Sequence, residues 1–182
     1  MAGDAIENSW KDSLKSKFPD FFRNVRVLDI GSADINGTNR PWFENCIYLG
    51  LDIKPYKNVD IVSIAHEYDA PDGSYDVVCS TSELEHDMYW DKTLKKMVDL
   101  VRSGGFMWFA GGYKRVIHGT KEYNPSDSLT SELDNKWADY YGGVSIEMVR
   151  KVLDLDSIFS LYEINYSQGN DECDIHFWGI KK

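Results

Sequence analysis

The stretch VLDIGSADINGT, residues 27–38, decides the predicted fold. It is an apolar run that ends in an acid and a glycine, followed by small and polar residues. This pattern is typical of a buried parallel strand that runs into a tight loop, where a ligand can approach the backbone. Two large classes of enzyme use such a loop, and they favour opposite charges beside it. The side chains around the loop therefore indicate which ligand it accepts.

The composition predicts one soluble, globular domain over residues 1–182. Hydrophobic residues make up 42% of the chain and charged residues 27%, as in a folded protein rather than a disordered one. The net charge of −10 disfavours binding to nucleic-acid phosphates. No run approaches the roughly 18 apolar residues of a membrane span, and the polar N-terminus lacks the apolar core of a signal peptide. We therefore expect a cytoplasmic protein with no nucleic-acid or membrane partner.

The three cysteines, Cys46, Cys79 and Cys173, are far apart in the sequence and form no CxxC pair. Their spacing predicts neither a disulfide framework nor a cysteine-based zinc site. Cys79 lies in an apolar run, so we expect it to be a small core residue.

Five short apolar runs are predicted as strands because they are continuous rather than alternating. Strands covered on both faces, as in parallel sheets, have this composition. The runs are Arg26–Ile30, Ile47–Ile53, Val59–Val62, Tyr75–Ser80 and Phe106–Ala110. The segment KPYKN between the second and third runs is too short for an ordinary helix.

Three segments have the apolar spacing of a helix. Residues 9–22 carry an apolar stripe, and Pro19 is expected to end or bend that helix. Residues 90–102 repeat the spacing and are followed by an SGG sequence that is expected to stop the helix. The third segment is 145–155, for which Ser145 is a favourable N-cap.

The C-terminal part of the chain predicts two more strands, Ile158–Tyr166 and Asp174–Ile180. The QGND sequence between them, residues 168–171, is too short for a crossover helix, so this pair is expected to be antiparallel. By contrast, residues 113–144 form a long polar and aromatic excursion after the fifth predicted strand. Long loops at the carboxyl ends of strands are where open α/β sheets place their substrate chemistry.

The first loop departs from the dinucleotide fingerprint, which has glycines at its first, third and sixth positions. These positions hold Gly31, Ala33 and Asn36. Asp29 lies two residues before Gly31, and its carboxylate would repel a pyrophosphate but favour an ammonium and a sulfonium. S-adenosylmethionine is a ligand with both of these cationic groups and no phosphate.

A second acid supports the same ligand. Asp52 ends the second predicted strand, 21 residues after Gly31, where acids of such folds bind ribose hydroxyls. One carboxylate accepts hydrogen bonds from both hydroxyls. The alternative is that Asp29 and Asp52 only cap turns.

These motifs resemble those of the class I S-adenosylmethionine-dependent methyltransferases, most closely the small "type 11" group. VLDIGSADINGT, YLGLDI, VDIVSIAHEYDAPDGSYDVV and STSELEH follow one another in the order of that family, within residues 26–112. The resemblance implies an α/β fold, a Rossmann-like three-layer sandwich. Its seven-stranded, mostly parallel sheet has the order 3-2-1-4-5-7-6 and an antiparallel last strand.

The resemblance also implies a set of cofactor-binding residues. Asp29 and Gly31 would face the methionine part, Asp52 would hold the ribose, and Ala65 and His66 would border the adenine. The full set expected is Asp29, Gly31, Ser32, Ala33, Asp52, Ile53, Ala65, His66 and Ser80. The chain departs from the family at Ala33, which replaces a glycine, and at Ile64, which replaces an acid that binds the adenine amino group. His66 could instead cap a turn.

The SELEHD sequence, residues 82–87, is expected to open the helix after the fourth strand. Some O-methyltransferases with an ExxEH pattern bind a divalent metal here, but Ser82 stands at the position of the first acid. Glu85 and His86 are too few to hold magnesium alone, although His118 could join them. We therefore predict no metal. The alternative role for His86 is packing at the helix start with a hydrogen bond to the backbone.

No residue is identified as catalytic from the sequence. His118 is either a general base or an exposed loop residue. Tyr140 and Tyr141, near Trp137 in the excursion, either line an acceptor pocket or form a satellite core. His118, His86, Tyr140 and Tyr141 are therefore the candidates.

The sequence predicts methyl transfer from S-adenosylmethionine to a small-molecule or glycan-type acceptor, with residues 1–24 and 113–144 on the acceptor side. One alternative is a non-catalytic domain that binds S-adenosylmethionine or S-adenosylhomocysteine. The other is a nicotinamide-linked oxidoreductase.

Overall fold

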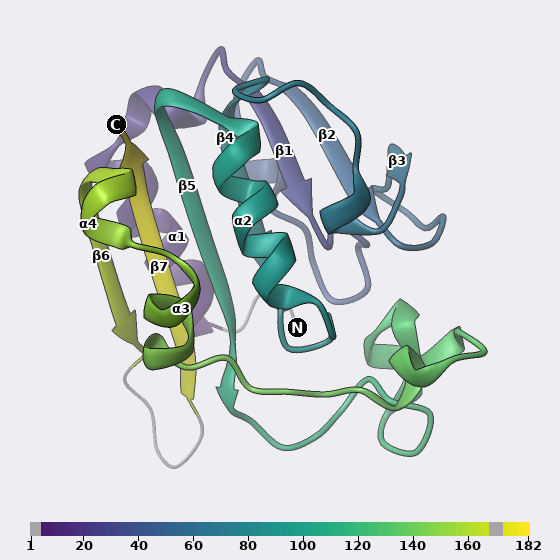
Figure 1. Ribbon diagram of the computed structural model, residues 1–182. Coiled ribbons are helices and arrows are strands. Elements are labelled where there is room, and N and C mark those ends of the chain that lie inside the picture. The colour runs from purple at the N-terminus through teal and green to yellow at the C-terminus, as the bar shows by residue number, and fades with distance from the viewer. Residues whose placement is uncertain (1–4, 168–172) are drawn as a thin grey trace.

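The computed structural model describes residues 5–167 and 173–182, and it shows one seven-stranded sheet with helices on both faces (Figure 1). The strand order is β3-β2-β1-β4-β5-β7-β6. The strands are β1 (Arg26–Ile30), β2 (Ile47–Asp52), β3 (Ile61–Val62), β4 (Tyr75–Thr81), β5 (Val101–Lys114), β6 (Phe159–Tyr166) and β7 (Cys173–Lys181). β7 runs antiparallel to both of its neighbours, β5 and β6. The predicted fold class, strand order and antiparallel last strand are confirmed.

The α-helices are α1 (Ala5–Lys17), α2 (Trp90–Leu100), α3 (Ile146–Val152) and α4 (Leu155–Ile158). The short 3-10 helices are η1 (Pro19–Phe22), η2 (Arg40–Trp42), η3 (Ala65–Glu67), η4 (Pro125–Asp127), η5 (Leu129–Glu132) and η6 (Lys136–Asp139). α1 covers one face of the sheet, and α2, α3 and α4 cover the other (Figure 1). None of the helices in the described ranges is long and apolar enough to cross a membrane.

Two hydrophobic clusters fill the spaces between these layers. In one cluster, Leu14 of α1 and Phe22 of η1 pack against one face of the sheet. That face carries Val27, Phe106 and Trp108. The opposite cluster joins the other sheet face to α2, α3 and α4. Successive strand residues point to opposite faces, so the continuous apolar runs supply both clusters.

Several local predictions are confirmed at the residue level. α1 ends at Lys17, just before Pro19, and Ser145 caps α3 by accepting a hydrogen bond from the Met148 amide at 3.2 Å. The predicted helix 145–155 is divided, because α3 ends at Val152 and α4 begins at Leu155. The predicted turn at residues 168–171 lies outside the described residues.

The fifth strand is longer than its apolar run predicts. β5 extends beyond Phe106–Ala110 at both ends, since it pairs with β4 on one side and with β7 as far as Lys114 on the other. α2 ends at Leu100, before the SGG sequence that was expected to stop it. Within that sequence, Gly105 lets β5 approach β4, because a Cβ there would lie 2.8 Å from the Asp76 carbonyl oxygen.

Candidate functional site

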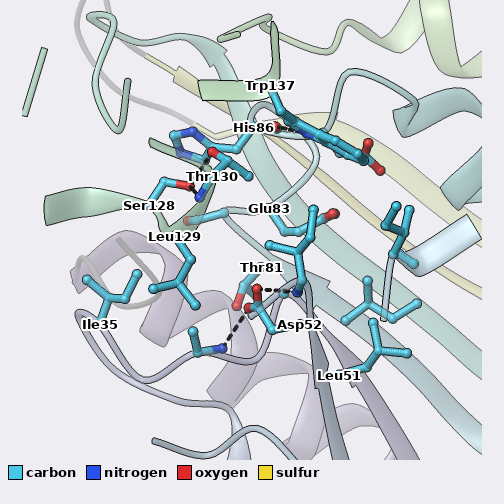
Figure 2. A pocket seen from close by; sticks show the side chains of 18 of the residues that line it. Ile35, Leu51, Asp52, Thr81, Glu83, His86, Ser128, Leu129, Thr130 and Trp137 are labelled. Atoms are coloured by element: carbon cyan, nitrogen blue, oxygen red, sulfur yellow. Dashed lines mark hydrogen bonds between the residues drawn. The ribbon is translucent and has the colours of Figure 1, made fainter. Parts of the chain in front are cut away.

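A pocket opens at the carboxyl ends of β1, β2 and β4 (Figure 2). The excursion crosses the molecule on the same side (Figure 1). The sheet side of the wall comes from the strand ends and the loops that follow them: Ile30, Gly31, Ala33, Ile35, Asn36, Leu51, Asp52, Ile53, Ser63, Ile64, Ala65, Thr81, Ser82, Glu83, His86 and Asp87. The excursion supplies Asp127, Ser128, Leu129, Thr130 and Trp137. The opening is therefore at the edge where open α/β sheets bind ligands.

Gly31 shapes the floor of this pocket. Its φ of +73° lies in the left-handed region, and a Cβ there would lie 2.3 Å from the Glu83 Cβ. Only glycine combines this backbone conformation with so close a neighbour. As a result, the loop after β1 turns sharply and Glu83 packs directly on its backbone.

Asp52, at the end of β2, is held in place by hydrogen bonds from the loop after β1 and from the residue that follows it in the chain. One of its carboxylate oxygens accepts a hydrogen bond from the Ala33 amide at 3.0 Å, and the other accepts one from the Ile53 amide at 2.7 Å (Figure 2). Desolvation raises the pKa of Asp52 to about 6, against the effect of these hydrogen bonds. The structure thus presents an oriented carboxylate at the tip of β2.

Asp29 lies behind the pocket wall rather than on it. Its side chain is 2% exposed, accepts a hydrogen bond from the Tyr48 hydroxyl, and accepts another from the Asn39 amide at 3.0 Å. Burial raises the pKa of Asp29. Asp29 is not among the lining residues in the described part of the chain, and its direct contact with the methionine part stays a prediction. Asn39 links Asp29 to the pocket wall, because its side-chain amide also donates a hydrogen bond to Thr81 at 3.0 Å.

The predicted cofactor set divides between the wall and the layer behind it. The residues on the wall are Gly31, Ala33, Asp52, Ile53 and Ala65. Asp29, Ser32, His66 and Ser80 lie outside the lining that the described residues form. Ser32 is buried with its hydroxyl 3.3 Å from the Asn58 carbonyl oxygen, and Ser80 is fully buried in β4. The His66 ring lies beside that of Tyr89, with the ring centres 5.0 Å apart, and the neighbouring wall residues are Ile64 and Ala65.

Glu83 is a wall residue that the sequence did not single out. Its Oε2 is buried and has no hydrogen-bond partner in the described part of the chain. Burial, followed by the charges of Asp87 and Asp52, raises the pKa of Glu83 well above its ordinary value. Its place in the STSELEH motif, directly after the fourth strand, is the signal that could have identified it.

The excursion closes over the pocket through its short 3-10 helices. Ser128 caps η5, because its hydroxyl accepts a hydrogen bond from the Thr130 amide at 3.3 Å. The Trp137 indole donates to the His86 carbonyl oxygen at 2.9 Å, and Lys54 forms an ion pair with Glu132. The aromatic wall residue is therefore Trp137. Tyr140 and Tyr141, the predicted candidates, lie outside the lining formed by the described residues.

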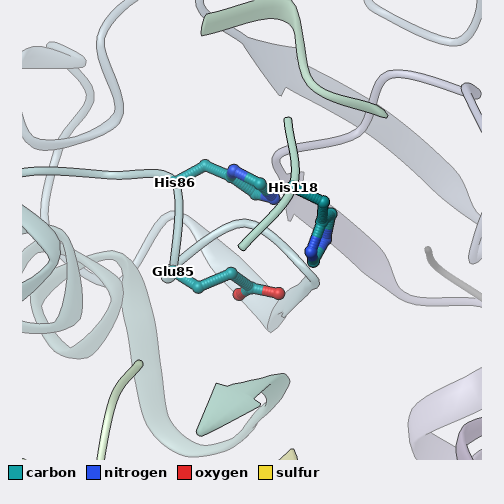
Figure 3. Close-up of side chains that lie close together, drawn as sticks. All are labelled: Glu85, His86 and His118. Atoms are coloured by element: carbon teal, nitrogen blue, oxygen red, sulfur yellow. The ribbon is translucent and has the colours of Figure 1, made fainter. Parts of the chain in front are cut away.

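A second group of side chains adjoins the pocket. Glu85, His86 and His118 point toward one another, although they come from the loop after β4 and from the excursion (Figure 3). The expectation that SELEHD opens a helix is wrong: α2 begins at Trp90, and Ser82 has a left-handed φ of +51°. Burial and then the charge of His118 lower the pKa of His86 to about 3. The Tyr141 ring borders this group, 5.3 Å from His86.

The sheet order, the antiparallel last strand and the Gly31–Asp52 pocket define a class: the chain has the fold of the class I S-adenosylmethionine-dependent methyltransferases. No model of a known protein family matches the chain, and no curated protein matches its sequence. The likeness to known proteins is therefore one of structure.

Three solved methyltransferase structures illustrate this likeness. One is the 1,6-didemethyltoxoflavin-N1-methyltransferase of Burkholderia thailandensis, crystallised with 1,6-didemethyltoxoflavin and S-adenosylhomocysteine. It has a TM-score of 0.67 at 13% identity, over 100% of this chain and 80% of that one. The N-methyltransferase NodS of Bradyrhizobium japonicum WM9, with S-adenosylhomocysteine, has a TM-score of 0.60 at 15% identity, over 98% of this chain and 88% of that one.

The third is the phosphoethanolamine N-methyltransferase 2 of Haemonchus contortus in complex with S-adenosyl-L-methionine. Its TM-score is 0.64 at 16% identity, over 95% of this chain and 52% of that one. The present chain thus spans about half the length of the Haemonchus enzyme.

Proposed function

We propose that this protein is a methyltransferase that uses S-adenosylmethionine and methylates a small molecule. The observation that carries the proposal is the carboxylate of Asp52, held at the tip of β2 by the amides of Ala33 and Ile53 and facing a pocket beside Gly31. A carboxylate in this position accepts hydrogen bonds from two ribose hydroxyls. The solved structures with the same fold, several of them crystallised with S-adenosylmethionine or S-adenosylhomocysteine, support the choice of ligand.

The rest of the wall fits the same ligand. Ile64 and Ala65 supply a part-apolar edge for an adenine, and the loop from Gly31 to Ala33 supplies close backbone for the amino-acid part. Glu83 and Asp87 add acidic groups. The Asp52 carboxylate, whose pKa of about 6 leaves it largely ionised at neutral pH, disfavours a dinucleotide, which carries a pyrophosphate.

S-adenosylmethionine, when bound, supplies an electrophilic methyl group on a sulfonium. The protein's part in such a displacement is mainly to align the acceptor and to exclude water. Ser128, Leu129, Thr130 and Trp137 are suited to this, because the excursion places them across the pocket from the strand ends. These residues combine hydroxyl groups with apolar and aromatic surface. A small polar acceptor, including a glycan-type intermediate, suits that combination.

Calorimetry with S-adenosylhomocysteine tests the proposal directly. We expect binding to the wild-type chain and a loss of about 1.5–3 kcal/mol for Asp52→Ala, the range for hydrogen bonds to charged groups. Asp72→Ala is the matched control, because Asp72 is an exposed acid that precedes β4, at the opposite end of that strand from the pocket. Its affinity should equal that of the wild type.

Two results would favour the alternatives. Tight NADH binding with no response to S-adenosylhomocysteine would indicate an oxidoreductase. Normal binding of S-adenosylhomocysteine without methyl transfer to any member of a broad panel of small hydroxyl, amine and carbon-acid acceptors would favour a non-catalytic binding domain.

A further inference from the structure

We propose that Glu85, His86 and His118 bind a zinc-type divalent cation at the rim of the pocket. By this we mean a transition-metal ion that prefers imidazole and carboxylate ligands. Each residue offers one ligand atom, and these atoms all lie within 4.8 Å of one another (Figure 3). One ion can therefore contact all three side chains after small adjustments.

Unpartnered polar atoms point to a missing ligand at this place. Glu85 is 2% exposed and His86 is 4% exposed. Glu85 Oε2 and both ring nitrogens of His86 have no hydrogen-bond partner within the described ranges. Buried polar atoms are nearly always partnered, since an unsatisfied one costs free energy. A cation between these side chains would satisfy the carboxylate and one ring nitrogen together.

A backbone contact indicates the tautomer of His118. Its Nδ1 lies 2.9 Å from the Val116 carbonyl oxygen, which can only accept a hydrogen bond. Nδ1 therefore carries the proton, and the lone pair is left on Nε2. Metal-binding histidines typically donate their other ring nitrogen to a carbonyl or carboxylate in this way.

Glycines leave room for the three side chains to meet. A Cβ on Gly111 would lie 3.1 Å from Glu85 Oε2, and one on Gly112 would lie 3.2 Å from Glu85 Oε1. Gly119 directly follows His118, has a left-handed φ of +64°, and would place a Cβ 2.6 Å from His86 Cε1. The excursion can approach His86 this closely because no side chain intervenes.

The donor set selects the kind of metal. Two imidazoles and one carboxylate form the ligand set of catalytic zinc and of some iron sites, which keep further positions open. Mg²⁺ prefers oxygen ligands in an octahedral arrangement, so this set suits it poorly. The sequence predicted no metal because Ser82 replaces the first acid of the ExxEH pattern, and Glu85 and His86 alone are too few. The fold brings His118, the third candidate ligand, beside them. His86 also lines the pocket, so the bound ion would adjoin the proposed methyl-acceptor side.

Metal titration of the untagged, EDTA-treated chain tests this inference without any methylation assay. We expect Zn²⁺ to bind at one equivalent per chain and to raise the midpoint of thermal unfolding, while Mg²⁺ does neither. Co²⁺ should give visible absorption without the intense thiolate bands that binding to Cys46, Cys79 or Cys173 would produce. Failure of Zn²⁺ to saturate, or thiolate bands with Co²⁺, would overturn the proposal.

Matched histidine variants assign the site. His118→Ala should weaken Zn²⁺ binding at least as much as the roughly 10- to 100-fold loss seen when second-shell partners of metal sites are removed. His66→Ala is the control, because His66 lies outside the cluster, and its Zn²⁺ affinity should be that of the wild type. Glu85→Gln should weaken binding too. If that buried variant fails to fold, the part-exposed His118 variant decides, and an unchanged affinity for it would refute the site.

Failure of this test would leave the proposed methyltransferase function intact, because S-adenosylhomocysteine binding is measured separately and depends on Asp52. Conversely, a chain that binds Zn²⁺ through these three residues but does not bind S-adenosylhomocysteine would keep the metal site and refute the proposed function.

Discussion

The side-chain amide of Asn39 donates a hydrogen bond to the carboxylate of Asp29 over 3.0 Å, and both side chains are almost completely buried. The second hydrogen of the same amide goes to Thr81 at 3.0 Å, and Lys11 of α1 donates to the Asn39 oxygen at 3.3 Å. Lys11 is itself paired with the buried Glu7 at 2.8 Å. The chain of contacts therefore runs from α1 to the pocket wall.

This arrangement makes Asn39 important for stability. Asn39→Ala removes two donors from buried acceptors, so we expect the free energy of unfolding to fall by about 1–3 kcal/mol. Denaturant unfolding measures the change. Asn165→Ala is the control, because Asn165 is exposed and its side-chain amide donates a hydrogen bond to Glu163 at the protein surface. Its effect should stay within roughly 0.5 kcal/mol. Equal effects of the two substitutions would contradict this role for Asn39.

The Asp52 carboxylate predicts a pH dependence of ligand affinity. Its pKa is raised to about 6 in the free protein, so lowering the pH through 6 protonates it and removes acceptor capacity for ribose hydroxyls. The affinity for S-adenosylhomocysteine should therefore be full above pH 7 and fall about tenfold by pH 5, one unit below this pKa.

The Asp52→Asn variant isolates this dependence, because Glu83 and Asp87 also border the pocket and have raised pKa values. Calorimetry from pH 5 to pH 8 should give a flatter profile for the variant than for the wild type. Profiles that fall in parallel would show that another group controls binding.

Alanine substitutions at two glycines distinguish the stability cost of backbone strain from that of steric overlap. Gly31 and Gly104 have similar left-handed φ values, +73° and +70°, but their neighbours differ. A Cβ on Gly31 would overlap Glu83 at 2.3 Å, whereas one on Gly104 would meet only the flexible end of Arg102 at 3.4 Å. Gly104→Ala should therefore cost about 1–2 kcal/mol of stability from the backbone alone.

Gly31→Ala should cost clearly more than Gly104→Ala in the same chemical denaturation experiment. It should also weaken S-adenosylhomocysteine binding, since Glu83 must move into the pocket or the loop must shift. Equal losses of stability would mean that the loop relaxes at no cost, and that the close contact does not require glycine.

The hydrogen bond from Trp137 to the His86 carbonyl oxygen is expected to hold the excursion against the loop after β4. Trp137→Phe keeps an aromatic ring but removes the hydrogen bond to the His86 carbonyl oxygen. We expect faster amide hydrogen exchange over residues 127–138, because local opening costs less when a buried contact is lost. Trp42→Phe is the matched control: it removes an indole hydrogen bond to Asp12, on the α1 side of the molecule. Unchanged exchange in 127–138 for the Trp137 variant would refute the attachment.

The sequence by itself determined the sheet and the floor of the pocket. The apolar runs, the glycine after β1 and the short connection before β7 act locally, through strand composition, left-handed backbone and chain length, so their consequences were predictable. The position of Asp52 at the tip of β2 and the capping of α3 by Ser145 were predictable for the same reason. The departure at β5 arose where pairing with β4 and β7 extended the strand through residues expected to end a helix. In the SELEHD loop, Ser82 adopts a left-handed φ and α2 begins only at Trp90.

Only the tertiary structure decided which polar side chains meet. Leu28 and Ile30 face the α2 side of the sheet and Val27 faces the α1 side. The two-residue period of a strand therefore directs Asp29 toward α1, away from the pocket. The excursion has no long regular element beyond β5, only short 3-10 turns, so periodicity could not show that Ser128 and Trp137 reach the wall. Nor could it show that His118 would lie beside Glu85 and His86. Those contacts depend on packing between segments distant in sequence, which local composition does not encode.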